Sequence, residues 1–127
     1  MELELALKIL VGAATVMLAG LGVMSMFAPR RMMNNFSIEP VGVPGLSTIR
    51  SVIGGLFLSC VMILAHGLIT GQTLGFVAVS LILSSVAVGR VVSIIADGLQ
   101  KEVIPPLVVE IVIITVLMGA HINLPAA

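Results

Sequence analysis

The sequence has few charged residues. Only 9% of its 127 residues are charged, whereas a soluble domain carries about 25%. Hydrophobic residues make up 59% of the chain, and the mean hydropathy is +1.27. Too few charged side chains are present to cover a surface that faces water, which excludes an ordinary soluble domain and a disordered tail. Six Lys and Arg balance six Asp and Glu, so no basic surface exists and we expect no nucleic-acid partner.

Aromatic residues and cysteine are also scarce. Tryptophan and tyrosine are absent, and phenylalanine occurs four times. The chain therefore lacks the aromatic belt that is common at membrane interfaces and the residues that usually form cages around cations. The single cysteine, Cys60, has no second cysteine to pair with and lies in an apolar run. We expect a buried thiol that packs as a small hydrophobic side chain.

Motifs for catalysis and for cofactor binding are missing as well. The sequence contains no phosphate-binding loop, no dinucleotide fingerprint, no zinc-protease motif and no nucleophile with an adjacent base. His66 and His121 end two of the apolar runs without the spacing of metal or haem ligands, and we interpret them as solvated interfacial residues. We therefore assign no catalytic residue, no metal site and no cofactor, and we favour a protein that is not an enzyme.

Four long apolar runs dominate the chain. Each is long enough to cross a bilayer, which takes about 20 residues. They cover residues 5–28, 47–69, 74–96 and 103–124. Backbone polar groups in hydrocarbon must be hydrogen-bonded within the segment, and the alternating pattern of a barrel strand is absent. The sequence predicts an all-α fold, an integral membrane four-helix bundle that forms one domain over residues 1–127.

The connections between the runs differ in length. Residues 70–73 form a tight turn, so the second and third spans should pack as an antiparallel hairpin. The first connection is long and rich in Pro, Gly and Asn. Within it, Met32, Met33 and Phe36 can line one face of a short interfacial helix. An irregular surface loop is the alternative interpretation.

Small residues recur at every fourth position in the two middle spans. Ser51, Gly55 and Ser59 share one face of the second span. The third span carries a similar stripe, formed by Ser85, Gly89 and Ser93. Helices in lipid associate through close packing of small residues. We expect the two stripes to face each other across the hairpin.

The basic residues indicate an orientation in the membrane. We call the end of the bundle with the first and third connections the loop end, and the end with the chain termini and residues 70–73 the turn end. The loop end holds most of the basic residues: Arg30, Arg31 and Lys101, with Arg50 and Arg90 near it. Because cytoplasmic loops are enriched in Lys and Arg, we expect the loop end in the cytoplasm and both termini outside.

Four ionisable residues lie inside the spans, toward the loop end: Arg50, Arg90, Asp97 and Glu110. Such residues are rare within membranes and pair with one another or mark a functional site. Arg50 lies at the N-terminal end of its span and Asp97 at the C-terminal end of its own, where each opposes the helix dipole and needs a specific partner. We predict a polar cluster of these four residues, either a salt-bridge network that sets helix register or a site for an anionic ligand.

Three sequence elements resemble the bacterial membrane family known as domain of unknown function 4345. The first, residues 49–58, carries Arg50 followed by the pair Gly54 and Gly55. The second, residues 89–98, begins Gly-Arg, ends Asp-Gly and has a serine between them, and Glu110 follows in the last span. The resemblance implies a four-helix protein of the bacterial inner membrane with no assigned activity. It supplies no substrate and no catalytic residues.

These features favour a non-enzymatic accessory or lipid-interacting membrane protein. Its expected partners are membrane lipids, with a membrane protein or a second copy of the chain as further candidates. One alternative is an oligomeric proton-coupled transporter of small molecules that uses Glu110. Small multidrug transporters match in length and span number, but their essential carboxylate lies in the first span and their pocket is aromatic. A second alternative is a membrane enzyme that acts on a lipid.

Overall fold

The computed structural model describes residues 2–125, and helices account for nearly all of them. Four helical segments are long and apolar enough to cross a membrane: Glu2–Phe27, Gly42–Thr70, Leu74–Asp97 and Lys101–Asn123. The described part of the chain contains no strand. The all-α prediction and its four membrane spans are therefore confirmed.

The first and last spans are single helices, α1 (Glu2–Phe27) and α6 (Ile104–Asn123), and the third is α5 (Leu74–Asp97). The second span is a continuous helix built from α3 (Gly42–Thr48), a π-helical turn η1 (Ile49–Ile53) and α4 (Gly54–Thr70). A short 3-10 turn, η2 (Lys101–Val103), leads into α6, which has prolines in its first turn. Proline is tolerated there because the first amides of a helix have no partner within it.

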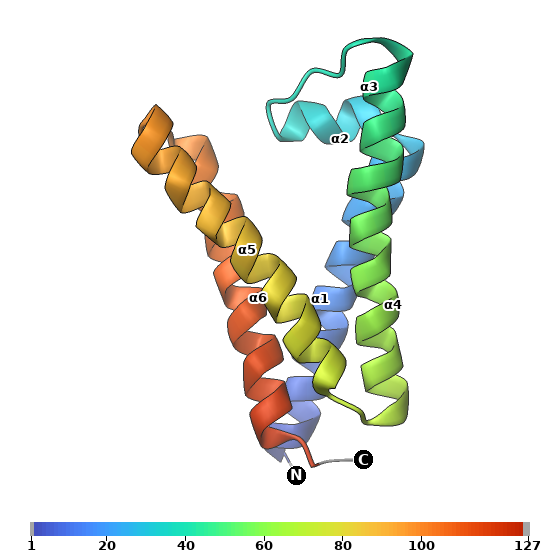
Figure 1. Ribbon diagram of the computed structural model, residues 1–127. Helices are drawn as coiled ribbons and strands as arrows, with labels where there is room; N and C mark the ends of the chain where they lie inside the picture. Colours follow the sequence, from blue (N-terminus) through green and yellow to red (C-terminus); the bar gives the residue numbers. More distant parts are fainter. Residues whose placement is uncertain (1, 126–127) are drawn as a thin grey trace.

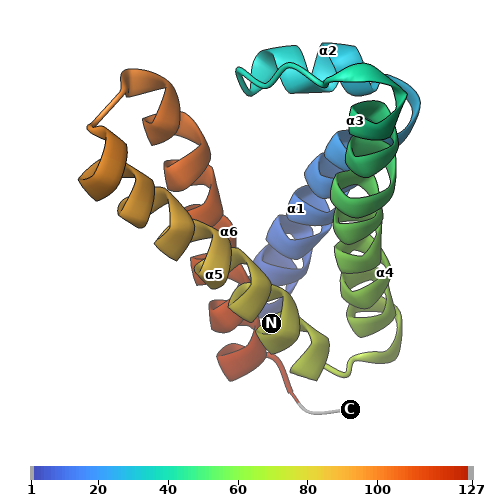
Figure 2. The same ribbon diagram turned by 45° about the horizontal axis from the view of Figure 1, so that its top comes forward.

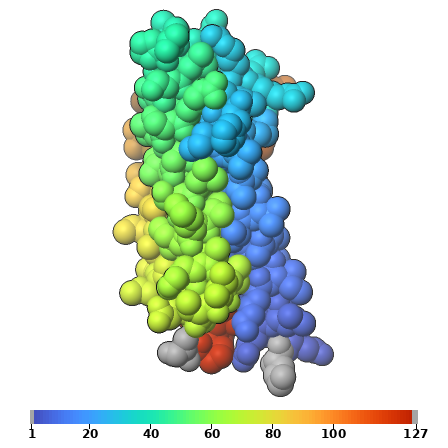
Figure 3. Space-filling model, turned by 90° about the vertical axis from the view of Figure 1, so that its right-hand side faces the viewer, coloured from blue at the N-terminus to red at the C-terminus, as the bar shows by residue number. Residues whose placement is uncertain are grey.

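The four spans form two arms that meet at the turn end and diverge toward the loop end (Figures 1 and 2). One arm pairs α1 with α4, and the other pairs α5 with α6. Figure 3 shows α1 and α4 side by side along their length. The turn end closes around one hydrophobic core to which all four spans contribute, with Val11, Leu64, Phe76 and Leu117 fully buried.

Glycine allows α1 and α4 to approach closely. A Cβ added at Gly54 would lie 3.3 Å from the backbone nitrogen of Met26 and 3.4 Å from the carbonyl oxygen of Gly22. A Cβ at Gly22 would lie 2.8 Å from the side chain of Leu58. Small residues at a helix crossing allow this backbone approach in membranes. The tight packing therefore joins the first and second spans.

The small-residue stripes of the middle spans do not face each other, so that prediction is wrong. A Cβ added at Gly55 or at Gly89 would meet no atom within 4 Å. Ser51, Ser59 and Ser85 are exposed and donate hydrogen bonds to carbonyls of their own helices. The reason is the divergence of the two arms, because α4 and α5 approach each other near their connecting turn and separate where the stripes lie.

The first connection contains a short helix, α2 (Pro29–Asn35), that lies across the loop end of the α1–α4 arm (Figure 1). Met32 and Met33 are 1% and 2% exposed and pack with Ile49 in a second hydrophobic cluster. Phe36 is partly buried against it. The prediction of a short helix is confirmed for Met32 and Met33, which lie on its buried face, whereas Phe36 caps its C-terminal end. The irregular-loop alternative is excluded for residues 29–35.

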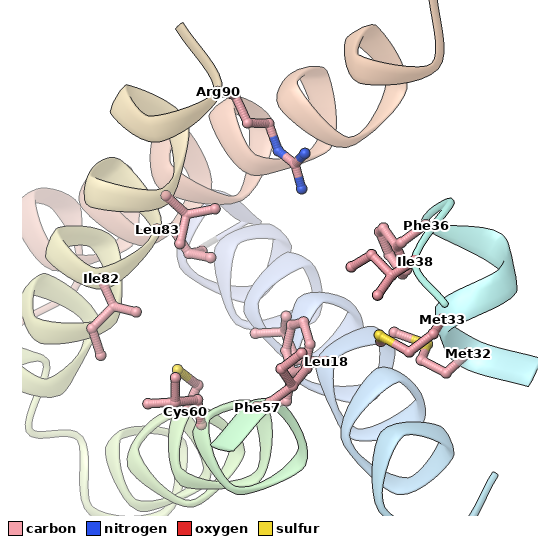
Figure 4. A pocket seen from close by; sticks show the side chains of 13 residues that line it. Leu18, Met32, Met33, Phe36, Ile38, Phe57, Cys60, Ile82, Leu83 and Arg90 are labelled. Atoms are coloured by element: carbon pink, nitrogen blue, oxygen red, sulfur yellow. The ribbon is translucent and has the colours of Figure 1, made fainter. Parts of the chain in front are cut away.

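The end of α2 is a Schellman turn that fixes the chain beyond it. Ser37 adopts a left-handed conformation, with φ of 59°. Its amide donates to the carbonyl of Asn34, and the amide of Ile38 donates to that of Met33. These are the two bonds of the motif, which usually has glycine in the left-handed position. The turn brings Phe36 and Ile38 to the inner side of the α1–α4 arm, facing α5 (Figure 4).

Candidate functional site

An ion pair links α5 to α6 in the half of that arm near the loop end. The Nε of Arg90 donates to both carboxylate oxygens of Glu110, with Oε2 at 3.1 Å. The Glu110 side chain is 10% exposed and that of Arg90 28%. Within residues 2–125 this is the one salt bridge. It satisfies the carboxylate, which would otherwise stand unpaired in the membrane.

The position of this pair follows from the ends of the two helices. Glu110 lies one turn after the prolines that begin α6, and Arg90 lies seven residues before the end of α5 at Asp97. Seven residues correspond to about 10 Å along a helix axis. Because α5 and α6 are antiparallel neighbours, the two side chains fall at the same depth and meet across the helix interface.

Arg50 lies outside this pair, contrary to the predicted cluster of four. Its guanidinium donates to the carbonyl of Met26, in the last turn of α1. The last carbonyls of a helix lack amide partners within it, and the helix dipole favours a cation beside them. Arg50 thus complements the dipole of α1. It does not oppose the dipole of its own span as expected, because the helix of the second span begins at Gly42 and Arg50 lies about two turns inside it. Arg50 does have a specific partner, but that partner is a helix end and not a carboxylate.

Asp97 also lies apart from the pair. It is exposed at the end of α5, where the hydroxyl of Ser93 approaches its Oδ2 at 3.5 Å. Asp97 therefore needs no cation, since it lies where the span leaves the membrane. The structure brings together two of the four predicted residues, Arg90 and Glu110.

A cavity of about 360 Å³ lies between the two arms on the side of the loop end. We call it the cleft. Its walls come from α1, α2, η1, α4 and α5, and nearly all of its lining residues are apolar. On the α5 side it is lined by Ile82, Leu83, Val86 and Arg90. Opposite them lie Met33, Phe36, Ile38 and Phe57, with Cys60 toward its deep end (Figure 4). Cys60 is 4% exposed, so the prediction of a buried thiol is confirmed.

Arg90 is the one charged residue of the cleft lining. Its Nε faces Glu110, while the two terminal nitrogens of its guanidinium point into the cleft toward Phe36 and Ile38 (Figure 4). In the described part of the chain no acceptor binds these terminal nitrogens. The ion pair and the cleft therefore form one site, a guanidinium fork held by a buried carboxylate at the mouth of an apolar cavity.

The cleft was not predicted from the sequence. Met32, Met33 and Phe36 gave a signal for one of its walls, because they mark the apolar face of α2. The opposite wall gave none, since Ile82, Leu83 and Val86 occur in a span that is apolar on every side and nothing separates residues that face a cavity from residues that face lipid.

The histidines lie at the turn end, away from the cleft. His66 is exposed, and Nδ1 of His121 shares a hydrogen bond of 2.9 Å with the hydroxyl of Thr73. No group of three or more His, Cys, Asp or Glu residues with metal-binding geometry occurs between residues 2 and 125. His121 thus connects the end of α6 to the turn before α5.

Comparison with known families supports the resemblance noted in the sequence. The family described as Domain of unknown function (DUF4345) matches residues 6–121. The match runs from the first turns of α1 almost to the end of α6 and includes both members of the ion pair. Neither a curated protein nor a solved structure matches the chain.

Proposed function

The chain belongs to the DUF4345 family, and from this premise we propose that it is a non-enzymatic, multi-pass protein of the bacterial inner membrane that binds membrane lipid in the cleft. The observation that carries the proposal is the guanidinium of Arg90 at the mouth of an otherwise apolar cavity. Binding sites for small molecules have this character, with apolar walls and a small number of polar groups that orient the ligand.

The surroundings of the cleft favour lipid as its occupant. Its walls belong to membrane spans, to the short helix α2 and to the turn that follows α2. Its apolar walls offer water few polar partners, so water is held there less favourably than in bulk. Acyl chains are the apolar molecules available at this depth of a bilayer. A lipid chain therefore fills the cleft at a lower free energy than water does.

The ion pair supports lipid binding over the transporter alternative. Proton coupling through Glu110 requires a carboxylate that releases and takes up a proton during the cycle. Both oxygens of Glu110 accept from Nε of Arg90, so the carboxylate is engaged within the protein and does not face the cleft as a free group. Glu110 is thus suited to holding Arg90 in place.

The proposed orientation places the mouth of the cleft on the cytoplasmic side. Arg30, Arg31 and Lys101 are exposed at the loop end, and basic residues are enriched on cytoplasmic faces. Both chain termini then lie outside the cytoplasm. The cleft would accept lipid from the inner leaflet.

Native mass spectrometry tests the proposal. The protein is released from nanodiscs of phosphatidylethanolamine and phosphatidylglycerol, and we expect one retained lipid per chain. The double variant Arg90→Gln/Glu110→Gln should lose this lipid, because it removes the guanidinium without leaving an unpaired charge. Arg31→Gln, which removes an exposed arginine outside the cleft, is the matched control and should retain it. A protein that leaves the nanodisc without lipid contradicts the proposal.

A further inference from the structure

We propose that the ligand of the cleft is a long-chain fatty acid, with its carboxylate on the terminal nitrogens of Arg90 and its chain along the apolar walls. The inference rests on the proposed function and narrows it to one class of lipid. It follows from three features of the site: the free edge of the guanidinium, its depth in the membrane and the size of the cavity.

The free edge of the guanidinium fits a carboxylate. Glu110 occupies the Nε of Arg90 and leaves the two terminal nitrogens directed into the cleft. The N–H groups of a guanidinium form a planar fork that binds a carboxylate through two parallel hydrogen bonds. A ligand carboxylate there lies closer to the positive charge of Arg90 than to the negative charge of Glu110. Glu110 acts as a positioning residue, since it fixes the plane and direction of the fork.

The depth of Arg90 favours a small head group. Arg90 lies about 10 Å along the axis from the end of α5, and the hydrocarbon core of a bilayer is about 30 Å thick. Because α5 has 24 residues, the guanidinium lies below the level of the phosphates. A phospholipid reaches it only if its glycerol and second chain also sink into the span region. The carboxylate of a fatty acid carries no such groups.

The size of the cavity favours a single chain. Its volume of about 360 Å³ lies at the low end of ligand sites, which range over about 300–1,000 Å³. Met33 lines the wall near the mouth with a flexible thioether side chain, and methionine adapts readily to the shape of an apolar ligand. Phe36 and Ile38 lie across from Arg90 and shield the head group from the loop end.

The absence of tryptophan and tyrosine allows a direct test. Leu56→Trp places a single fluorophore in the cleft lining. Val88→Trp places one on an exposed position of α5 outside that lining. Val88 lies fourteen residues after the start of α5 at the turn end, and Leu56 lies fourteen residues before the end of α4 there. Both reporters therefore lie the same number of residues along their helices from the turn end, and a quencher dissolved in the bilayer has access to both.

The probe is a stearate brominated at the middle of its chain, added to phosphatidylcholine nanodiscs. We expect it to quench Leu56→Trp at concentrations about tenfold or more below those that quench Val88→Trp, since hydrogen bonds to charged groups contribute about 1.5–3 kcal/mol. Adding Arg90→Gln/Glu110→Gln to the reporter should abolish the difference, and adding Arg31→Gln should preserve it. The brominated methyl ester, which lacks the charge, should show no preference for the cleft.

Several results would overturn the inference. Equal quenching of the two reporters, an equal preference for the methyl ester, or a preference that survives the loss of Arg90 each refutes the fatty acid. A brominated phosphatidylglycerol that quenches Leu56→Trp selectively where the stearate does not would refute it too, but would leave lipid binding intact. If neither lipid prefers the cleft, the proposed function fails together with the inference. A second copy of the chain that fills the cleft would give a dimer in which both reporters are quenched equally. That result also refutes the fatty-acid inference.

Discussion

Arg90 and Glu110 are best tested by replacing each with glutamine, alone and together, and measuring the free energy of unfolding in mixed micelles of mild detergent and dodecyl sulfate. Arg90→Gln leaves a carboxylate that is 10% exposed without its cation. Removing one partner of a buried ion pair costs about 3–5 kcal/mol. We expect about 3 kcal/mol here, because the pair lies at the edge of the cleft.

Glu110→Gln should cost less. The side chain that it leaves unpaired belongs to Arg90, which is 28% exposed and long enough to turn into the cleft and toward the interface. We expect about 1.5 kcal/mol, the lower value for a hydrogen bond to a charged group. The asymmetry between the two variants follows from the difference in exposure of the two side chains.

The double variant removes both charges and leaves neither unpaired, so its cost should be close to that of the milder single variant. The coupling energy between the two positions is then about 3 kcal/mol, at the upper end of the range for residues in contact. If the costs of the two single variants simply add in the double variant, the two side chains do not interact in the folded protein. If Glu110→Gln is the more damaging change, the burial argument is wrong.

Four further variants test the fold, each by its midpoint of thermal unfolding in detergent. Ser37→Gly should stabilise the protein by about 1 kcal/mol, because a left-handed conformation costs a residue with a Cβ about 1–2 kcal/mol; an unchanged midpoint would contradict the Schellman turn. Gly67→Ala should destabilise it by about 1–3 kcal/mol through overpacking, since the added Cβ would lie 2.6 Å from a ring carbon of Phe76 in α5. Gly12→Ala is the matched control: its added Cβ would meet no atom within 4 Å, so it should stabilise α1 by up to about 1 kcal/mol. Arg50→Met should cost about 1 kcal/mol by removing the cation beside the Met26 carbonyl, and a neutral result would show that this contact contributes nothing.

The sequence predicted the pair of Arg90 and Glu110 because an unpaired charge in lipid costs free energy. Glu110 has a short side chain well inside the last span, so it requires a cation at its own depth, and Arg90 is at that depth. The expectation of a partner for Arg50 came from the helix dipole and from a predicted helix start at residue 47, whereas the helix begins at Gly42. The carbonyl of Met26 could not be found in this way, because a backbone group at the end of another helix leaves no mark in the sequence.

The small-residue stripes show the limit of pattern reasoning in membranes. The spacing of Gly55 and Gly89 within their spans resembles that of a packing face, yet both are open in the structure. Gly22 and Gly54, which are less regular in their surroundings, make the close crossing. Such a spacing arises readily in spans rich in Gly and Ser, and the tertiary contacts decide which glycines are used.

The sequence by itself determined that the chain is all-helical, that it has four spans and that Arg90 and Glu110 require partners. These features follow from the bilayer, which demands backbone hydrogen bonds within each segment and penalises unpaired charge. Only the tertiary structure decided which helices pair, where the arms diverge and that a cleft opens beside Arg90. The reason is that these spans are apolar on every side, so residues that face lipid, a neighbouring helix or a cavity have the same composition, and close packing alone distinguishes them.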